Sequence, residues 1–342
     1  HAARGESEAD DRARHGGEGS ASDESHAARG ESEADDRARH GGEGSASDES
    51  HAARGESEAD DRARHGGEGS ASDESHAARG ESEADDEPAA GWIDSHCHLD
   101  GERIPGGATA AIAAAVDAGV DTMICVGCDR ASSLAGIRLA EEHSAVHATV
   151  GLHPHEARHG VESVADLFAA AGIVAVGECG LDFHYDHSPR DAQRTAFAEQ
   201  IAVAHERSLP LVIHTREAWD ETFEILDREG VPTRTIFHCF TGGVDEMRAC
   251  VARSAYVSFS GIVTFPSAVD VQAAARECPL ERLLVETDSP FLAPAPNRGK
   301  PNSPAWVPLV GEAIASLRGL TVDEVRTTSR AATLAAFAGL VA

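Results

Sequence analysis

The sequence predicts an α/β fold, a (β/α)8 TIM-type barrel, from two observations on residues 88–342. Eight short apolar runs occur there, and segments of helical period rich in Ala, Glu and Arg separate them. Strict alternation of strands and helices implies a parallel sheet, and the lack of a glycine-rich dinucleotide loop favours a closed barrel over a doubly wound sheet. The 255 residues also match the usual size of one such domain.

The expected strands are the apolar runs, taken in chain order. They lie at 91–95, 121–126, 145–150, 173–177, 209–213, 234–237, 255–259 and 282–286. The expected helices lie at 108–118, 131–143, 161–171, 190–207, 217–229, 243–252, 267–277, 304–318 and 321–338. Pro189 and Gly230 are the start and stop signals expected for the fourth and fifth of these helices.

Residues 1–87 differ from the rest of the chain. They hold three identical copies of a 25-residue unit and a partial fourth, and they carry about −16 of the formal net charge of −30. Alanine is the unit's only apolar side chain, so burial cannot offset the entropy of ordering the backbone. We expect a disordered acidic tail. The identity of the copies indicates a recent in-frame expansion without a molecular role, with a solubility or interaction tail as the alternative.

The predicted barrel domain is also acidic, and Lys300 is its only lysine. This composition is typical of proteins adapted to high salt, where charges are screened over a few ångströms. It argues against broad electrostatic capture of nucleic acid, which needs a basic surface, so a substrate phosphate must be held locally.

Location and partners follow from what the sequence lacks. No run of 18 apolar residues and no signal-peptide pattern occurs, so neither a membrane span nor a leader is expected. The seven cysteines, an odd number scattered among apolar runs, suit a reducing compartment. Cys125 and Cys128 have the spacing of half a zinc ribbon, but the sequence has no second pair of cysteines with this spacing. We therefore expect buried structural cysteines. These observations predict a cytoplasmic protein without a stable protein partner.

Potential metal ligands follow five of the apolar runs, where a (β/α)8 barrel builds its active site. They are His96, His98, Glu178, His214, His238 and Asp288. One residue separates the first two histidines, and the period of two along an extended chain points both rings to the same side.

The mixed imidazole and carboxylate set suits Mg²⁺, Mn²⁺ or Zn²⁺. Six ligands are too many for one tetrahedral site and predict two divalent ions that share a bridging carboxylate. The expected arrangement is His96, His98 and Asp288 around one ion, His214 and His238 around the other, and Glu178 between them.

Six motifs in chain order resemble those of the TatD-family hydrolases. They are IDSHCHL at 93–99, GLHPH at 151–155, GECGLD at 177–182, HTR at 214–216, HCFTG at 238–242 and ETDSP at 286–290. The resemblance spans 91–342 and leaves out the tail. It implies a metal-dependent (β/α)8 hydrolase with deoxyribonuclease activity, and the six predicted ligands match the family's ligand positions.

The segment RGKPN at 298–302 also resembles the family's loop after the eighth strand. Arg298 and Lys300 are predicted to hold a substrate phosphate there, with a solvated turn as the alternative. Arg216, two residues beyond a predicted ligand, is a further candidate for binding phosphate.

Other polar residues are expected near the barrel mouth. His153 ends the third run and is predicted to donate a hydrogen bond to a phosphoryl oxygen. His155 and His159 are expected on the surface, and Asp182 and Tyr185 are candidates for the entrance or for loop packing.

The predicted reaction is hydrolysis of a DNA phosphodiester by metal-activated water, with Asp288, Glu178 and His153 as the catalytic residues and Asp288 as the proton acceptor. Single strands or ends are the expected substrate, because a barrel mouth admits a flexible strand more easily than a duplex. The alternative is a hydrolase of a small ester, amide, lactone or aminoacyl-tRNA ester at the same two-metal site. A non-enzymatic scaffold is disfavoured by the complete ligand set.

Overall fold

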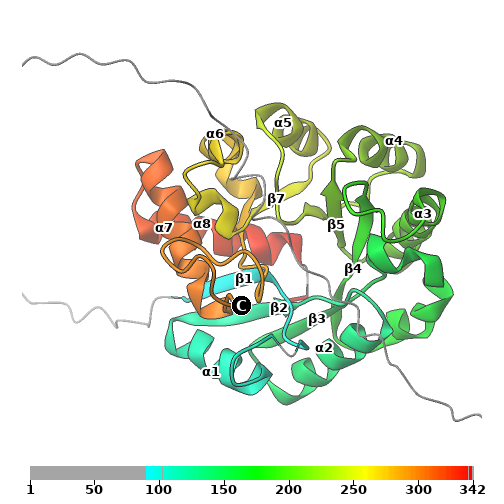
Figure 1. The fold of residues 1–342 in the computed structure, drawn as a ribbon, viewed down its shortest axis with the longest axis horizontal. Helices are drawn as coiled ribbons and strands as arrows, with labels where there is room; N and C mark the ends of the chain where they lie inside the picture. The colour runs from blue at the N-terminus through cyan, green and yellow to red at the C-terminus, as the bar shows by residue number, and fades with distance from the viewer. Residues whose placement is uncertain (1–89, 102, 338, 341–342) are drawn as a thin grey trace, which may run out of the picture. The chain divides into compact units, whose positions relative to one another are not determined.

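The computed structural model describes residues 90–101, 103–337 and 339–340, and the predicted tail at 1–87 lies outside these residues. Eight parallel strands pair in sequence order from β1 to β8. Their bounds are Trp92–Cys97 (β1), Val120–Cys125 (β2), Val146–Val150 (β3), Ile173–Asp182 (β4), Leu211–Arg216 (β5), Thr235–Phe237 (β6), Tyr256–Phe259 (β7) and Leu283–Val285 (β8). The predicted barrel is confirmed, and helices surround the strands (Figure 1).

The α-helices follow the strands in the predicted alternation. They are Ala108–Asp117 (α1), Arg130–Glu142 (α2), Arg190–Arg207 (α3), Trp219–Glu229 (α4), Val244–Ala252 (α5), Val269–Glu277 (α6), Val307–Arg318 (α7) and Val322–Ala336 (α8). Pro189 precedes α3, and Gly230 ends α4 at a φ of 86°, a left-handed backbone conformation that favours glycine. No helix in the described part of the chain is long and apolar enough to cross a membrane.

The prediction of an α-helix at 161–171 is wrong. Three short 3₁₀ helices, Pro154–His159 (η2), Val161–Ser163 (η3) and Ala165–Ala169 (η4), connect β3 to β4 instead. Val161, Val164 and Leu167 are all buried, and their spacing of three residues suits the 3.0 residues per turn of a 3₁₀ helix. The same apolar residues therefore fit both kinds of helix, and the spacing alone does not separate them.

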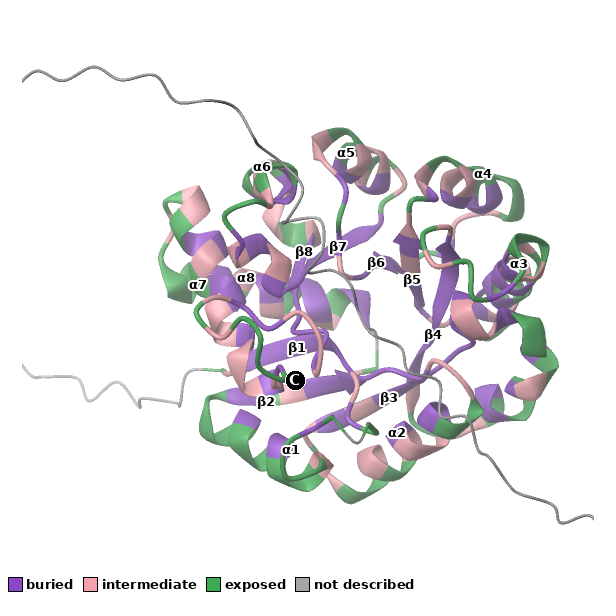
Figure 2. Ribbon diagram, in the orientation of Figure 1, coloured by how far each residue is buried: buried purple, intermediate pink, exposed green. Residues whose placement is uncertain are grey.

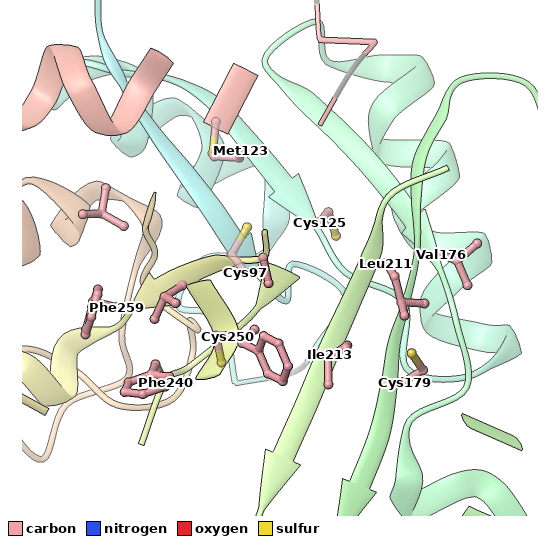
Figure 3. Close-up of a cluster of buried hydrophobic side chains, with 14 of the residues drawn as sticks. Cys97, Met123, Cys125, Val176, Cys179, Leu211, Ile213, Phe240, Cys250 and Phe259 are labelled. Carbon is pink, nitrogen blue, oxygen red and sulfur yellow. The ribbon is translucent and has the colours of Figure 1, made fainter. Parts of the chain in front are cut away.

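Alternation along the strands creates two apolar layers. Met123 and Cys125 belong to the cluster that packs between the strands and the surrounding helices (Figure 3). Ile124 faces the barrel interior, where strand residues pack against Ala336 and Phe337 at the end of α8. The strands are mostly buried, and the helices are exposed mainly on the side away from the strands (Figure 2). α8 therefore closes the barrel at the end where the strands begin and leaves the opposite end for the site.

The ring closes where the segment after β8 meets β1. The Asp288 N–H donates to the His96 carbonyl at 2.9 Å, and the His98 N–H donates to the Ser289 carbonyl at 2.8 Å. The buried Asp94 carboxylate accepts hydrogen bonds from the Thr287 N–H (2.9 Å) and hydroxyl (2.5 Å). Burial raises the pKa of Asp94 to about 8, although these hydrogen bonds favour its charged form. These hydrogen bonds between β1 and the segment after β8 hold three predicted ligands, His96, His98 and Asp288, in fixed relative positions.

Candidate metal centre

The structure brings all six predicted ligands together at the carboxyl ends of the strands. His96 lies within β1, Glu178 within β4 and His214 within β5, whereas His98, His238 and Asp288 follow the ends of their strands. β4 is longer than the apolar run that predicted it and continues to Asp182. Three overlapping groups place potential ligand atoms within 4.8 Å of one another: His96, His238 and Asp288; His96, His98 and Glu178; and His153, Glu178 and His214.

One oxygen of the Glu178 carboxylate faces the two histidines of β1. Glu178 Oε2 lies 3.4 Å from His96 Nε2 and 3.9 Å from His98 Nε2. The Asp288 Oδ1 atom lies 3.3 Å from His98 Nε2 and 3.9 Å from His96 Nε2. These distances are compatible with the prediction that the two histidines and Asp288 surround one ion.

The other oxygen of the Glu178 carboxylate, Oε1, faces a second set of histidines. Glu178 Oε1 lies 2.7 Å from His238 Nε2, 3.1 Å from His214 Nδ1 and 3.3 Å from His153 Nε2. Glu178 is buried, which disfavours its charged form, but the surrounding imidazoles hold the pKa of its carboxyl well below the usual range. An ionised carboxylate with one oxygen toward each set of histidines is the arrangement that a bridging ligand requires.

The residues present fit a divalent cation. Nδ1 of His96 and both ring nitrogens of His238 are buried and find no hydrogen-bond partner within the described residues. His238 Nε2 is close to Glu178 Oε1 but not oriented for a hydrogen bond. A buried polar atom without a partner destabilises the fold, and a cation beside Glu178 would offer His238 Nε2 the interaction that it lacks. Imidazole nitrogens with carboxylate oxygens are the donor set of borderline divalent ions.

The TatD related DNase family model matches residues 93–338. The chain belongs to this family. It is 39% identical over 237 residues to the uncharacterized metal-dependent hydrolase YabD of Bacillus subtilis, a match that covers 68% of this chain and 93% of that protein. It is 34% identical over 219 residues to the 3'-5' ssDNA/RNA exonuclease TatD of Escherichia coli, with 61% and 84% of the two chains covered.

Solved structures agree with this assignment. The crystal structure of YJJV, a TatD homolog from Escherichia coli, aligns with a TM-score of 0.69 and 29% sequence identity over 73% of this chain and 98% of that one. The TatD-family chain described here is therefore a metal-dependent hydrolase built on a TIM barrel, as its sequence predicts.

A second layer of carboxylates orients the histidines of this TatD-family hydrolase. Asp182 Oδ2 lies 3.0 Å from both His214 Nε2 and His155 Nε2, and Asp182 is fully buried. Glu286 Oε1 accepts the Cys239 N–H at 2.6 Å and lies 3.5 Å from His238 Nδ1. Carboxylates of this kind fix the ring orientation of metal-binding histidines.

Two predictions from the sequence need correction at this point. His155, expected on the surface, is half-buried and interacts with Asp182. Cys128, expected to be a structural cysteine, places its Sγ atom 3.6 Å from Glu178 Oε2 and 3.8 Å from His98 Nδ1. The missed signal was position along the chain. His155 lies in η2, which follows β3, and Cys128 lies in the loop after β2, so both are at the same end of the barrel as the predicted ligands.

His153 has the geometry of a hydrogen-bond donor. Its Nδ1 accepts the His155 N–H at 3.0 Å, which assigns the proton of the neutral ring to Nε2, the atom that faces Glu178. Burial lowers the pKa of His153 to about 4, so the ring is neutral at pH 7. A neutral ring with Nε2–H can donate to an oxygen, as the sequence predicts, although the same ring also belongs to a potential metal-binding group.

Of the predicted phosphate-binding residues, Arg216 ends β5, and Arg298 and Lys300 lie in the segment between β8 and α7. The Arg216 guanidinium lies over the Tyr185 ring, 4.6 Å from its centroid. The Arg298 guanidinium lies 3.7 Å from the centroid of Phe265, and Lys300 Nζ donates to Asn297 Oδ1 at 3.2 Å. Arg298 and Lys300 are exposed. Their role in holding phosphate stays a prediction.

Binding of a divalent ion is expected to release protons from this centre. Burial disfavours the charged form of His98, but its hydrogen bond to Asp288 and the charge of that carboxylate raise its pKa to about 9. Burial likewise opposes charge on His238, yet Glu178 raises the pKa of its ring well above the usual range. Both shifts favour the protonated ring, and a metal must displace that proton, so metal affinity should rise with pH by up to about tenfold per unit for each proton released.

Calorimetric titration of Mn²⁺ between pH 6 and 8, in buffers of different ionisation enthalpy, measures this release. The expected result is an apparent enthalpy that varies with the buffer and an affinity that increases toward pH 8. An enthalpy and affinity that are the same in every buffer and at every pH would contradict the protonated state of the two rings.

Replacing Asp182 with Asn is expected to weaken metal binding by roughly 10- to 100-fold. An amide can still accept one hydrogen bond, but it carries no charge to stabilise the His214 and His155 rings that share this carboxylate. Competition with a chelator measures the affinity. The matched control is Asp186→Asn, because Asp186 is exposed in the loop between β4 and α3 and pairs with Arg190 at the start of α3. Equal affinities in the two variants would exclude an orienting role for Asp182.

Proposed function

We propose that this chain is a divalent-metal-dependent nuclease that hydrolyses phosphodiester bonds of DNA, in single strands or at ends. The observation that carries the proposal is the Glu178 carboxylate with a set of histidines at each oxygen, the arrangement of two-metal phosphoesterases. The relative named as a 3'-5' ssDNA/RNA exonuclease supports the same substrate class. Two ions, Mg²⁺, Mn²⁺ or Zn²⁺, are the proposed cofactors.

The proposed ligands divide into two sets. His96, His98 and Asp288 would hold one ion, His214 and His238 the other, and Glu178 would contact both. When bound, such ions lower the pKa of water toward about 7 and so provide a nucleophile at neutral pH.

The remaining steps are assigned to side chains of the protein. Asp288 is ionised, because the His98 hydrogen bond and charge lower the pKa of its carboxyl despite burial, and it accepts the proton of the attacking water. His153 donates from Nε2 to a phosphoryl oxygen. Arg216, Arg298 and Lys300 hold flanking phosphates, a local cationic set on an otherwise acidic protein.

Location is part of the proposal. All seven cysteines are free thiols, which supports a reducing compartment, and we propose the cytoplasm. The high-salt origin expected from the composition stays a prediction.

End-labelled single-stranded DNA tests the nuclease proposal. The protein is stripped with a chelator in high KCl and then supplied with Mg²⁺, Mn²⁺ or Zn²⁺ separately. A ladder of products restored by one metal is the expected result, and it also identifies the cofactor and the polarity. Stoichiometric metal binding without any DNA cleavage would contradict the proposal and favour a hydrolase of small esters or aminoacyl esters.

A further inference from the structure

A row of rings runs outward from the metal centre toward the loop between β4 and α3. His155 packs edge-on against His153 at 4.4 Å between centroids and against His187 at 4.6 Å. The Tyr185 and His187 rings are stacked, with an interplanar angle of 3° and 5.4 Å between centroids. Arg216 lies over Tyr185. The row thus begins at a ring that faces Glu178 and ends at His187, which is exposed.

The loop that carries the outer rings is fixed at both ends. Asp182 Oδ1 accepts the Tyr185 N–H at 2.9 Å, while Oδ2 of the same carboxylate lies 3.0 Å from His214. At the other end the Ser188 hydroxyl donates to the His155 carbonyl at 2.7 Å. The ring pair is therefore positioned by the same group that orients a predicted metal ligand. Rings held in place before binding lose little entropy when a ligand stacks on them.

Tyr185 and His187 do not belong to the buried core. Phe197 and Phe237 are fully buried, whereas Tyr185 is half-buried and His187 exposed. Phe183 and Trp219 are also half-buried, but they pack against the core cluster, which does not include Tyr185. The chain has only two tyrosines, and the other, Tyr256, packs in the barrel interior. One of two tyrosines thus lies half-buried in the loop between β4 and α3, among His155, His184, His187 and Arg216.

We propose that Tyr185 and His187 form a subsite that stacks the nucleobase adjacent to the scissile phosphate. The proposal rests on the nuclease function proposed above and names the part of the substrate that this loop recognises. Stacking of a base on an aromatic side chain improves binding by about 5- to 100-fold and tolerates any base. Unlike phosphate neutralisation, it does not require a basic surface, which this acidic chain lacks. The Arg216 guanidinium lies over the same ring, so the proposed base subsite adjoins a residue proposed to hold phosphate.

Equilibrium binding of two probes tests the subsite without depending on catalysis. The full chain is loaded with Mn²⁺ and titrated with dAMP and with 2-deoxyribose 5-phosphate, which lacks the base. Wild type is expected to bind dAMP about tenfold more tightly, and the double variant Tyr185→Leu, His187→Ala to lose that preference. Tyr185→Phe keeps the ring and should keep the preference. Equal affinity of wild type for both probes, or a preference that survives in the double variant, would overturn the subsite.

His159→Ala is the matched control, because His159 is an exposed histidine that pairs with Glu156 and is not part of the row. It should bind both probes as wild type does. A loss of preference in this control would show that any exposed histidine has the same effect and would overturn the assignment to Tyr185 and His187.

Cleavage separates failure of the subsite from failure of the nuclease function. Single-stranded oligonucleotides with a normal or an abasic terminal nucleotide are compared, with kcat and KM measured for each. The subsite predicts a higher KM for the abasic end in wild type and equal KM values in the double variant. Efficient cleavage of both ends with equal KM in wild type overturns the subsite and leaves the nuclease intact. A dAMP preference without any DNA cleavage overturns the nuclease and supports a nucleoside-binding site.

Discussion

Replacing Glu178 with Gln is expected to lower the rate of DNA hydrolysis by at least about three orders of magnitude and to reduce the number of tightly bound divalent ions. Glu178 Oε2 faces His96 and Oε1 faces His238 at 2.7 Å, so both oxygens are needed. Gln has nearly the same shape, but an NH₂ group replaces one carboxylate oxygen. That group donates hydrogen bonds and cannot bind a cation. The change therefore removes the bridge without creating a cavity.

Elemental analysis after dialysis gives the metal content, and product ladders from end-labelled DNA give the rate. Glu221→Gln is the matched control, since Glu221 lies on α4 and pairs with Arg194. It should keep both the metal and the activity. If Glu178→Gln retained two ions and the parental rate, Glu178 would not be the shared ligand.

Replacing Asp288 with Asn is expected to reduce kcat by orders of magnitude with only a modest loss of metal. An ionised carboxylate can accept the proton of the attacking water, and an amide cannot. Asp288 has a φ of 55°, a left-handed conformation that Asn also tolerates, so the backbone after β8 should be preserved. Asn can also still accept the hydrogen bond from His98, which lies 3.3 Å away.

Metal content and kcat measured on the same preparation decide the role of Asp288. Loss of metal in proportion to loss of activity would restrict Asp288 to holding the ion. Cleavage of DNA at the parental rate would exclude it as the proton acceptor.

The strand pattern and the convergence of the six predicted ligands could be predicted from sequence for one physical reason. In a parallel barrel the carboxyl ends of all strands meet at one end, so polar residues that follow apolar runs must converge, whatever their separation along the chain. His98 and Asp288, separated by 190 positions, accordingly lie 3.3 Å apart. Glu178 was recognisable even though β4 extends beyond it.

The parts that were missed depend on side-chain direction and local backbone geometry. The connection at 161–171 was misassigned because buried residues three apart fit a 3₁₀ helix as well as an α-helix. His155 was placed on the surface because its contact with Asp182, 27 positions away, depends on how η2 packs against β4. The contact of Cys128 with Glu178 likewise depends on how the loop after β2 folds back.

The most direct measurement is an anomalous difference map from crystals of this protein grown or soaked with Mn²⁺. Two peaks are expected, one on each side of the Glu178 carboxylate, the first within bonding distance of His96, His98 and Asp288 and the second within bonding distance of His214 and His238. A peak far from Glu178, or no peak at a Mn²⁺ concentration that supports hydrolysis, would contradict the assignment of this cluster as the metal centre.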